Sequence, residues 1–332
     1  MRMPGIDPGT TKTTALTASP GRSSKSINSV RINTRMISME EEYKKTGVTP
    51  SDIAALRGWL KTQPHLPEKY ITDFDLLLAY YCCFKSSAVA KKVLDINFTL
   101  RTLFTNLFQN RVVDKSIIKT LDVVCALPLK ASSIDKHYRV IYHSLIDHDA
   151  KNFIFTDVIR TVLMLVDVTQ YRDGTAPGYL ILIDLNGVSL SHITKLDLQT
   201  VQQILYFLQE AILIRLRGVH FLNAPSYIDR LMMILRPFIK KELMNMVCIH
   251  SAGSNSIEKL IPVEALPIEA GGKFKSYAEA KSEATELLLS NKEFFINENK
   301  KRVVESLRPG KPKTITDIFG GIEGSFKKLD ID

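Results

Sequence analysis

Long hydrophobic runs are missing from this sequence of 332 residues. A helix that crosses a bilayer needs about twenty mostly apolar residues, whereas the apolar segment VIRTVLMLVDV is interrupted by Arg160 and Asp167. A transmembrane helix is therefore not expected. Hydrophobic residues make up 45% of the chain and charged residues 24%, as in an ordinary globular protein.

Cysteine is scarce, and no metal site is predicted. The four cysteines are Cys82, Cys83, Cys125 and Cys248. They show neither the paired spacing of metal ligands nor a disulfide framework. With no secretory signal, we expect a reducing, cytoplasmic compartment. His137 and His143, on one predicted strand, would stand about 20 Å apart, too far apart to share one ion.

Motifs of nucleotide-binding and hydrolytic enzymes are also missing. Neither G-x-G-x-x-G nor G-x-x-x-x-G-K follows a predicted strand, and G-x-S-x-G does not occur. Asp184 ends a predicted strand but has no partner base, so we expect it to hold a turn or cap a helix. An enzyme is not expected, and no cofactor is predicted.

The net charge of +9 is unevenly distributed. Residues 1–39 contain six basic residues and one acid, a balance of +5, so the rest of the chain carries only +4. This segment is rich in Ser, Thr, Gly and Pro and is predicted to be a disordered tail, with a targeting peptide as the alternative. The remaining charge is too weak for nucleic-acid binding but leaves contact with an anionic membrane open.

Residues 179–251 predict an α/β architecture. The runs YLILID, GVHFLN and MVCIHS are typical of buried strands. Two segments with apolar residues at helical spacing separate them, so the pattern strand, helix, strand, helix, strand predicts a parallel sheet. A further strand is expected in KHYRVIYHSLID, and a helix over residues 157–168.

The second helix of this stretch, SYIDRLMMILRPFIKKEL at residues 226–243, is apolar around nearly its whole circumference. Covering one face of a sheet needs a stripe of only about 100°. Leaving four such side chains in water would cost roughly 6–12 kcal/mol in sum, so something else must cover them. Candidates are another part of the chain, a subunit, an apolar ligand or a bilayer. Pro237 is expected to bend or weaken the helix.

Helices dominate both ends of the chain. Thr49-Pro50-Ser51-Asp52 predicts a helix start, and further helices are expected over residues 73–84, 87–108 and 276–307. The predicted domains are a tail at 1–39, a helical domain at 40–115, a central domain at 120–275, and a helix with an irregular tail at 276–332.

The residues IRLRGVHFLNAPSYIDRLMMILRPFIKKEL, IHSAG and LPIEAGG resemble the CRAL-TRIO lipid-binding family. The ending FGGIEGSFKKLDID resembles its insect α-tocopherol transfer protein-like branch, close to cellular retinaldehyde-binding protein. The resemblance implies the CRAL-TRIO fold: a mainly parallel sheet flanked by helices, with a mobile gate helix over a hydrophobic pocket and a small all-helical N-terminal domain. The gate corresponds to residues 226–243. Two departures are the segment AYYCCFK, where Tyr80 and Cys82 stand in place of arginines that many relatives carry, and Ala270 in place of a tyrosine.

The resemblance also implies site residues. Those expected to bind lipid are Ile159, Val162, Leu163, Val166, Tyr179, Ile183, Leu196, Ile204, Phe207, Leu208, Ile212, Val219, Tyr227, Ile228, Leu231, Met232 and Leu235. Arg215 and Arg217 align with basic residues that contact phosphoinositides in a relative. Arg236, Lys240 and Lys241, near the gate, complete a predicted membrane-phosphate site.

The predicted function is that of a carrier, expected to be monomeric, cytoplasmic and transiently membrane-associated. It would hold a tocopherol, a retinoid or a similar lipid and transfer it between membranes, with possible phosphoinositide contact. The alternatives are a membrane-recruited lipid-sensing regulatory or scaffold module, and a phospholipid exchange protein.

Overall fold

The computed structural model describes residues 38–132 and 137–320. The predicted disordered tail therefore lies outside the described residues, apart from its last two positions. Ser38 caps the first helix, α1 (Met39–Thr46), because its side chain accepts a hydrogen bond from the backbone N–H of Glu41 at 3.4 Å.

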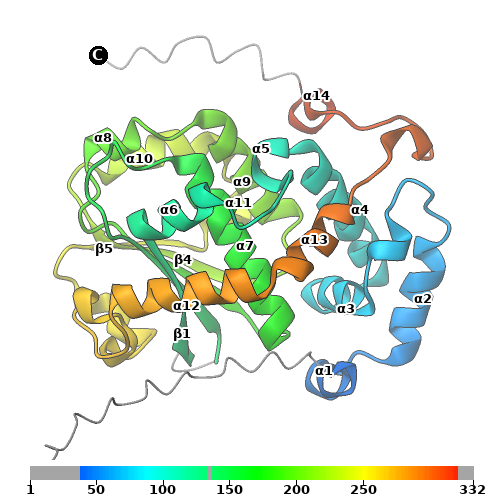
Figure 1. Ribbon diagram of the computed structural model, residues 1–332, viewed down its shortest axis with the longest axis horizontal. Coiled ribbons are helices and arrows are strands. Elements are labelled where there is room, and N and C mark those ends of the chain that lie inside the picture. The colour runs from blue at the N-terminus through cyan, green and yellow to red at the C-terminus, as the bar shows by residue number, and fades with distance from the viewer. Residues whose placement is uncertain (1–37, 133–136, 321–332) are drawn as a thin grey trace, which may run out of the picture. The chain divides into compact units, whose positions relative to one another are not determined.

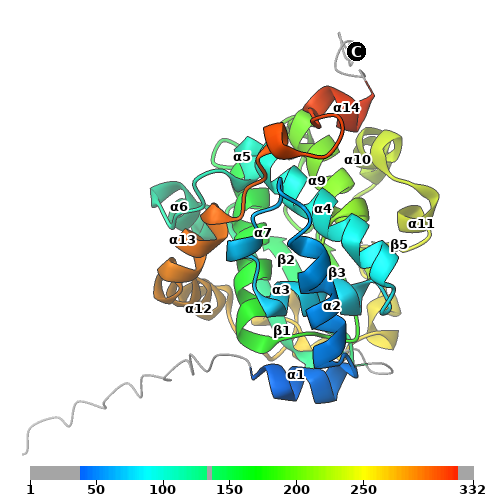
Figure 2. The same ribbon diagram turned by 90° about the vertical axis from the view of Figure 1, so that its right-hand side faces the viewer.

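Helices fill the amino-terminal part of the described chain (Figure 2). They are α2 (Pro50–Leu60), α3 (Asp73–Cys82), α4 (Ser87–Leu103), α5 (Thr105–Phe108) and α6 (Lys115–Val123), with a short 3₁₀ helix, η1 (Glu68–Tyr70). The predicted start at Thr49 is confirmed, since Thr49 and Asp52 form a reciprocal capping box. The single helix predicted over residues 87–108 is wrong: the chain leaves helical geometry at Phe104, which is fully buried.

A five-stranded sheet occupies the centre of the fold (Figure 1). Its strands are β1 (Val124–Ser132), β2 (Arg139–Leu145), β3 (Tyr179–Asp184), β4 (Leu216–Ala224) and β5 (Val247–Ser251). They lie in the order β1-β2-β3-β4-β5. The pairs from β2 to β5 are parallel, which confirms the predicted mainly parallel sheet.

The antiparallel strand β1 was not predicted from the sequence, because Pro128 lies within it. Proline lacks the N–H that a central strand needs, but an edge strand tolerates it. Pro128 pairs with Ile141 of β2, and β1 has one neighbour only.

The two faces of the sheet are covered by different segments. One face packs against residues 255–280 and the start of α12 (Tyr277–Ser290), through Leu127, Tyr142 and Leu182 among others. The other face lies opposite α7 (Phe155–Asp173), α9 (Leu198–Glu210) and α10 (Ile228–Leu235), with a cavity between the sheet and these helices. Because side chains alternate along a strand, each strand contributes to both layers.

The remaining elements are short. They are α8 (Leu190–Ile193), η2 (Arg236–Phe238), α11 (Lys241–Met244), η3 (Asn255–Lys259), η4 (Val263–Ala265), η5 (Ile268–Ala270), α13 (Lys292–Lys300), η6 (Glu305–Leu307) and α14 (Ile315–Phe319).

Two of the predicted long helices are broken. The gate segment, predicted as one helix over residues 226–243, forms α10, then a 3₁₀ turn that contains Pro237, then α11. The helix predicted over residues 276–307 breaks at Asn291 and ends at Lys300. The carboxyl-terminal tail was predicted to be irregular, but part of it forms α14. Phe319 of α14 stacks on Phe104 with ring centroids 5.8 Å apart. Residues 321–332 lie outside the described chain.

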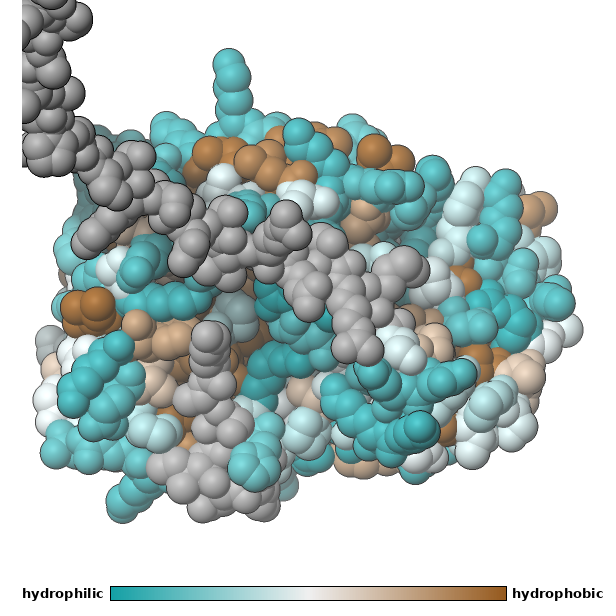
Figure 3. Space-filling view, turned by 60° about the horizontal axis from the view of Figure 1, so that its bottom comes forward, coloured by the Kyte–Doolittle hydropathy of each residue, from teal (hydrophilic) through white to brown (hydrophobic). Residues whose placement is uncertain are grey.

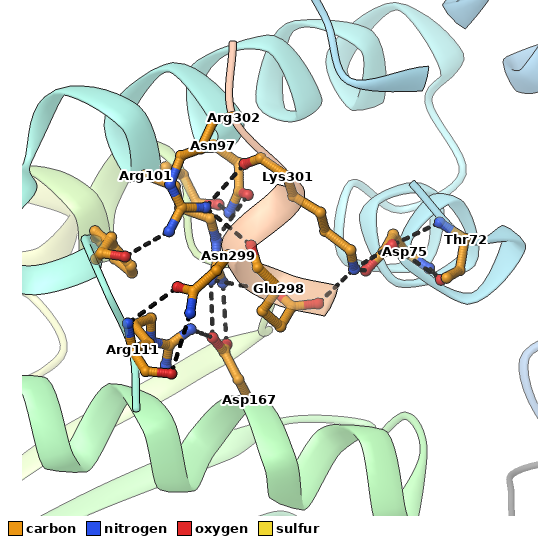
Figure 4. Close-up of polar contacts among 12 residues, drawn as sticks. Thr72, Asp75, Asn97, Arg101, Arg111, Asp167, Glu298, Asn299, Lys301 and Arg302 are labelled. Atoms are coloured by element: carbon orange, nitrogen blue, oxygen red, sulfur yellow. Dashed lines mark hydrogen bonds and ion pairs between the residues drawn. The ribbon is translucent and has the colours of Figure 1, made fainter. Parts of the chain in front are cut away.

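Buried charges join α4, α7 and α13 (Figure 4). Asp167 of α7 accepts hydrogen bonds from Arg101 at 2.8 and 3.0 Å and from Arg111 at 2.6 Å. Lys301 lies 2.5 Å from Glu298, which is 3.7 Å from Arg101. Burial alone would raise the pKa of Asp167, but the two guanidinium charges outweigh it and hold that pKa well below its ordinary value.

Candidate functional site

A cavity of about 320 Å³ lies between the sheet and the helices α7, α9 and α10. Its lining is almost wholly apolar. The lining residues come from β1 to β5, from those helices, from α8 and α11, and from the connecting segments around them.

The alternation of strands and the periodicity of helices explain why the lining is apolar. On β3, Ile181 and Ile183 face the cavity, while Leu180 and Leu182 belong to the opposite layer. Helix α7 presents a stripe at spacings of three and four residues. The stripe consists of Ile159, Val162, Leu163 and Val166. These residues therefore meet the cavity on one side of α7.

Twelve of the seventeen residues expected to bind lipid line this cavity. They are Ile159, Val162, Leu163, Val166, Ile183, Leu196, Ile204, Leu208, Ile212, Val219, Leu231 and Leu235. The structure thus brings together residues from α7, β3, α9, β4 and α10 around one space. Whether they contact a lipid stays a prediction.

The other five residues do not belong to this lining. The buried ring of Phe207 packs 4.9 Å from Phe108, and Tyr179 accepts a hydrogen bond from Arg139 at 2.9 Å. Tyr227 donates its hydroxyl hydrogen to the carbonyl oxygen of Val188. Ile228 and Met232 pack in the apolar cluster around α10.

Several lining residues were missed in the sequence. Ile141, His143 and Leu145 alternate along β2 and line the cavity, so the period-two pattern of KHYRVIYHSLID was a usable signal. His192 carried no comparable signal, because α8 is a single turn whose position only the fold reveals.

Helix α10 forms one wall and has two apolar sides. Leu231 and Leu235 line the cavity, whereas Met233 is 67% exposed. Met233 is the one large apolar side chain of the described gate segment that is exposed, and the cavity lies beneath the helix.

The polar side chains of the lining are those of His143, Ser144, Asp184 and His192. Burial lowers the pKa of His143 to about 4 and also lowers that of His192. Asp184 accepts hydrogen bonds from Tyr142 at 2.7 Å, Asn223 at 2.8 Å and the backbone N–H of Asn186 at 2.9 Å. It therefore holds the turn after β3, as expected from the sequence.

The five basic residues predicted to contact phosphate form two groups. Arg215 lies over the ring of Tyr81 at 3.6 Å and donates to the Tyr81 carbonyl oxygen at 2.9 Å. The exposed Arg217 lies between the rings of Phe84 and Tyr138. Exposed side chains at the end of α10 make up the other group. They are Arg236, Lys240, which is paired with Glu210, and Lys241.

No described helix is long and apolar enough to cross a membrane. Within residues 38–132 and 137–320, no group of three or more His, Cys, Asp or Glu side chains is placed to hold a metal ion. On the face drawn in Figure 3, hydrophilic residues surround separate hydrophobic patches.

The fold and the cavity define an α/β protein with an apolar cavity between its sheet and its helices. Residues 132–272 match the model of the CRAL/TRIO domain, and residues 45–118 match a model described as Pinta-like, UBA domain. Residues 132–272 therefore form a domain of the CRAL/TRIO family.

Relatives in vertebrates are about a quarter identical to this chain over the aligned residues. Clavesin-1 of Rattus norvegicus is 27% identical over 233 residues, which cover 69% of this chain and 65% of the rat protein. Clavesin-1 of Xenopus laevis is 27% identical over 230 residues, 68% of each chain. Clavesin-2 of Homo sapiens is 28% identical over 130 residues, 39% of this chain and 40% of the human one. The crystal structure of Sfh5 superposes with a TM-score of 0.41 at 11% identity, covering 77% of this chain and 96% of Sfh5.

Proposed function

We propose that this protein carries a small hydrophobic lipid, such as a tocopherol or a retinoid, and transfers it between membranes by noncovalent binding. The observation that carries the proposal is the cavity of about 320 Å³ with its nearly continuous apolar lining. Ligand cavities in proteins span about 300–1,000 Å³, and burial of apolar surface supplies roughly 25 cal/mol per Å². A lipid would gain affinity from the whole lining.

Helix α10 is the proposed gate. Leu231 and Leu235 contribute to the cavity wall, while Met233 is exposed on the outside. Displacing α10 would open the cavity and present apolar side chains to a bilayer. Arg236, Lys240 and Lys241 follow directly, and each basic group near an anionic surface contributes about 1 kcal/mol. We propose that these residues meet anionic lipids, including phosphoinositides, during a transient contact made from the cytoplasm.

Lipid extraction and a transfer assay test this function. Purified monomeric protein extracted with organic solvent should release a lipid in stoichiometric amount, measured by mass spectrometry. Leu231→Asp and Leu235→Asp should slow lipid transfer between vesicles by more than tenfold, because a carboxylate destabilises both the closed cavity and insertion into a bilayer. Leu289→Asp, at a 40% exposed position on α12, is the matched control.

Two results would contradict the proposal. One is extraction without any bound lipid. The other is unchanged transfer by the two gate variants while the control behaves like the parent protein. A bound lipid that does not exchange with vesicles would instead indicate a lipid-sensing module.

A further inference from the structure

A pair of histidines joins the last two strands on the face of the sheet that lies away from the cavity. Nδ1 of His220, on β4, lies 3.0 Å from Nε2 of His250, on β5. Nδ1 of His250 lies 2.5 Å from the hydroxyl oxygen of Ser256, on η3. His220 is only 5% exposed, and its neighbour Val219 lines the cavity on the other face. The pair therefore links β4, β5 and η3 outside the cavity.

Strand β5 lies at the edge of the sheet and has little core packing of its own. Its one neighbour is β4, and the pairing between them becomes irregular between Phe221 and Ala224. None of the five residues of β5 is buried, and Cys248 and Ile249 are exposed. The short ladder and the histidine pair, rather than a buried core residue, therefore hold β5 against β4.

Strand β5 and the short helix before it close one side of the cavity. Leu243 of α11 and Val247 of β5 both belong to the cavity lining. Between these two elements, the carbonyl oxygen of Met246 accepts a hydrogen bond from the backbone N–H of Val219 at 2.9 Å. Separating β5 from β4 would break that bond and open the cavity on this side.

The hydrogen bond between the two rings depends on their protonation. A neutral imidazole has one nitrogen that donates and one that accepts, whereas a protonated imidazole only donates. A single hydrogen between the facing nitrogens makes the bond, and the bond survives the addition of one proton to the pair. When both rings are protonated, two N–H groups face each other and two positive charges repel at this short distance. The doubly protonated pair therefore cannot stay closed.

Among the described residues, no countercharge offsets this repulsion. Burial lowers the pKa of His220 to about 4, with a smaller effect from the charge of His250, and burial also lowers the pKa of His250. The elements around the pair, β3, β4, β5 and η3, carry other titratable or charged residues, but none of them contributes to either shift. They are Tyr179, Asp184, Arg217, Cys248, Glu258 and Lys259. Because a histidine in an open segment has a pKa of about 6.5, the open form binds protons more tightly and acid favours it.

We propose that His220 and His250 form an acid-sensitive latch: protonation of both rings releases β5 from β4 and opens the cavity at its α11 and β5 side. The latch is closed above about pH 6.5 and opens progressively as the pH falls below that value. Faster release of a bound lipid at acidic pH follows from the opening. This consequence rests on the proposed function, whereas the latch itself does not.

Hydrogen–deuterium exchange tests the latch on the full, lipid-free chain. Exchange of the backbone amides of residues 246–251 is measured by mass spectrometry at about pH 7.5 and about pH 5, and is corrected for the intrinsic pH dependence of exchange. In the double variant His220→Asn and His250→Gln, side-chain amides replace the two facing nitrogens and do not titrate in this range. His148→Gln, at an exposed histidine in the loop after β2, is the matched control.

The expected result is an acid-dependent opening confined to β5. In the parent protein the opening equilibrium of β5 should rise by roughly tenfold or more at the lower pH, because each pH unit below about 6.5 favours the protonated open form by up to about tenfold. The double variant should change by less than about twofold, and His148→Gln should behave like the parent protein. Exchange in β3, in the middle of the sheet, reports global unfolding and should change less than exchange in β5.

A release assay connects the latch with the cavity. Parent protein loaded with a fluorescent tocopherol should release it to phosphatidylcholine vesicles faster at the lower pH, and the double variant should lose this acceleration. If the double variant does not fold, His250→Gln alone gives the same comparison, because a pair with one histidine cannot be doubly protonated and His250 is only half-buried.

Different results would contradict the latch and the proposed function. Exchange of β5 that does not depend on pH, or that depends on it equally in the parent protein and the histidine variants, would overturn the latch and leave the proposed function standing. Opening of β5 without faster release would overturn its effect on the cavity. Failure of the parent protein to bind the fluorescent tocopherol at either pH would count against the proposed function, while the exchange data would still decide whether the latch exists.

Discussion

Replacing Asp167 by asparagine should destabilise the fold more than any exposed charge change. Asp167 is the acceptor for Arg101 and Arg111, and Arg111 is fully buried. Asparagine has nearly the same size and keeps one acceptor oxygen, but it removes the negative charge. Two guanidinium groups would then share a poorly solvated site with Glu298 as the remaining acid near Arg101.

The magnitude follows from the burial of the pair. Removing one partner of a buried ion pair costs about 3–5 kcal/mol, because the other charge is left uncompensated. Since about 1 kcal/mol shifts the melting temperature by roughly 2–4 °C in larger domains, Asp167→Asn should lower it by roughly 6–20 °C. Urea unfolding followed by circular dichroism gives the free energy directly.

A matched control lies on the same helix. Asp173 pairs with its neighbour Arg172 in a partly exposed position, with 33% of its side chain accessible. Asp173→Asn should cost less than about 1 kcal/mol. If Asp167→Asn unfolds cooperatively within about 1 kcal/mol of the parent protein, the buried charges do not stabilise α7 and the reasoning is refuted.

Three further predictions concern protonation, the cavity and a helix cap. Burial lowers the pKa of His143 from about 6.5 to about 4, so the unfolded chain binds a proton that the folded chain rejects. The free energy of unfolding should fall by up to about 3 kcal/mol as the pH drops from about 6.5 to about 4. His143→Phe, measured by urea unfolding, should lack the part of this fall that comes from His143. Val219→Phe should fill part of the cavity and lower the amount of lipid recovered by solvent extraction, while the melting temperature of lipid-free protein does not fall. Thr49→Ala should cost about 1 kcal/mol in urea unfolding, because α2 loses its capping box.

Most of the fold follows from local sequence patterns. The strands β3, β4 and β5 and the crossover helices between them have apolar runs and periodicities that allow one interpretation. The two errors in the predicted elements have physical causes. Strand β1 was not predicted because it contains Pro128, and the gate helix was predicted too long because apolar residues continue beyond Pro237, near which α10 ends. Composition alone cannot show where a helix stops when the residues on both sides are equally apolar.

The cavity was less predictable than the fold. Residues on the α7 stripe line the cavity as expected, because one face of a helix meets one surface. Phe207 and Tyr179 do not, since each turns toward a neighbour that is distant in sequence, Phe108 in one case and Arg139 in the other. His192 was missed because α8 is a single turn, and only the fold places it beside the cavity.

The walls of the cavity are held in place by different kinds of contact. Helix α7 is held by buried charges, and the strands are held by their ladders. Helix α10 has only eight residues, and side-chain hydrogen bonds hold the chain on both sides of it. Before the helix, the Tyr227 hydroxyl donates to the Val188 carbonyl oxygen. After it, the Gln209 side chain donates to the Phe238 carbonyl oxygen at 2.9 Å and accepts from the Lys240 backbone N–H at 2.7 Å. These hydrogen bonds hold the segments on either side of α10, whereas the helix itself is held by apolar contacts. Contacts with a bilayer can replace those apolar contacts at a small cost in free energy. We therefore infer that opening proceeds by displacement of α10, with the segments at Tyr227 and Phe238 as its hinges.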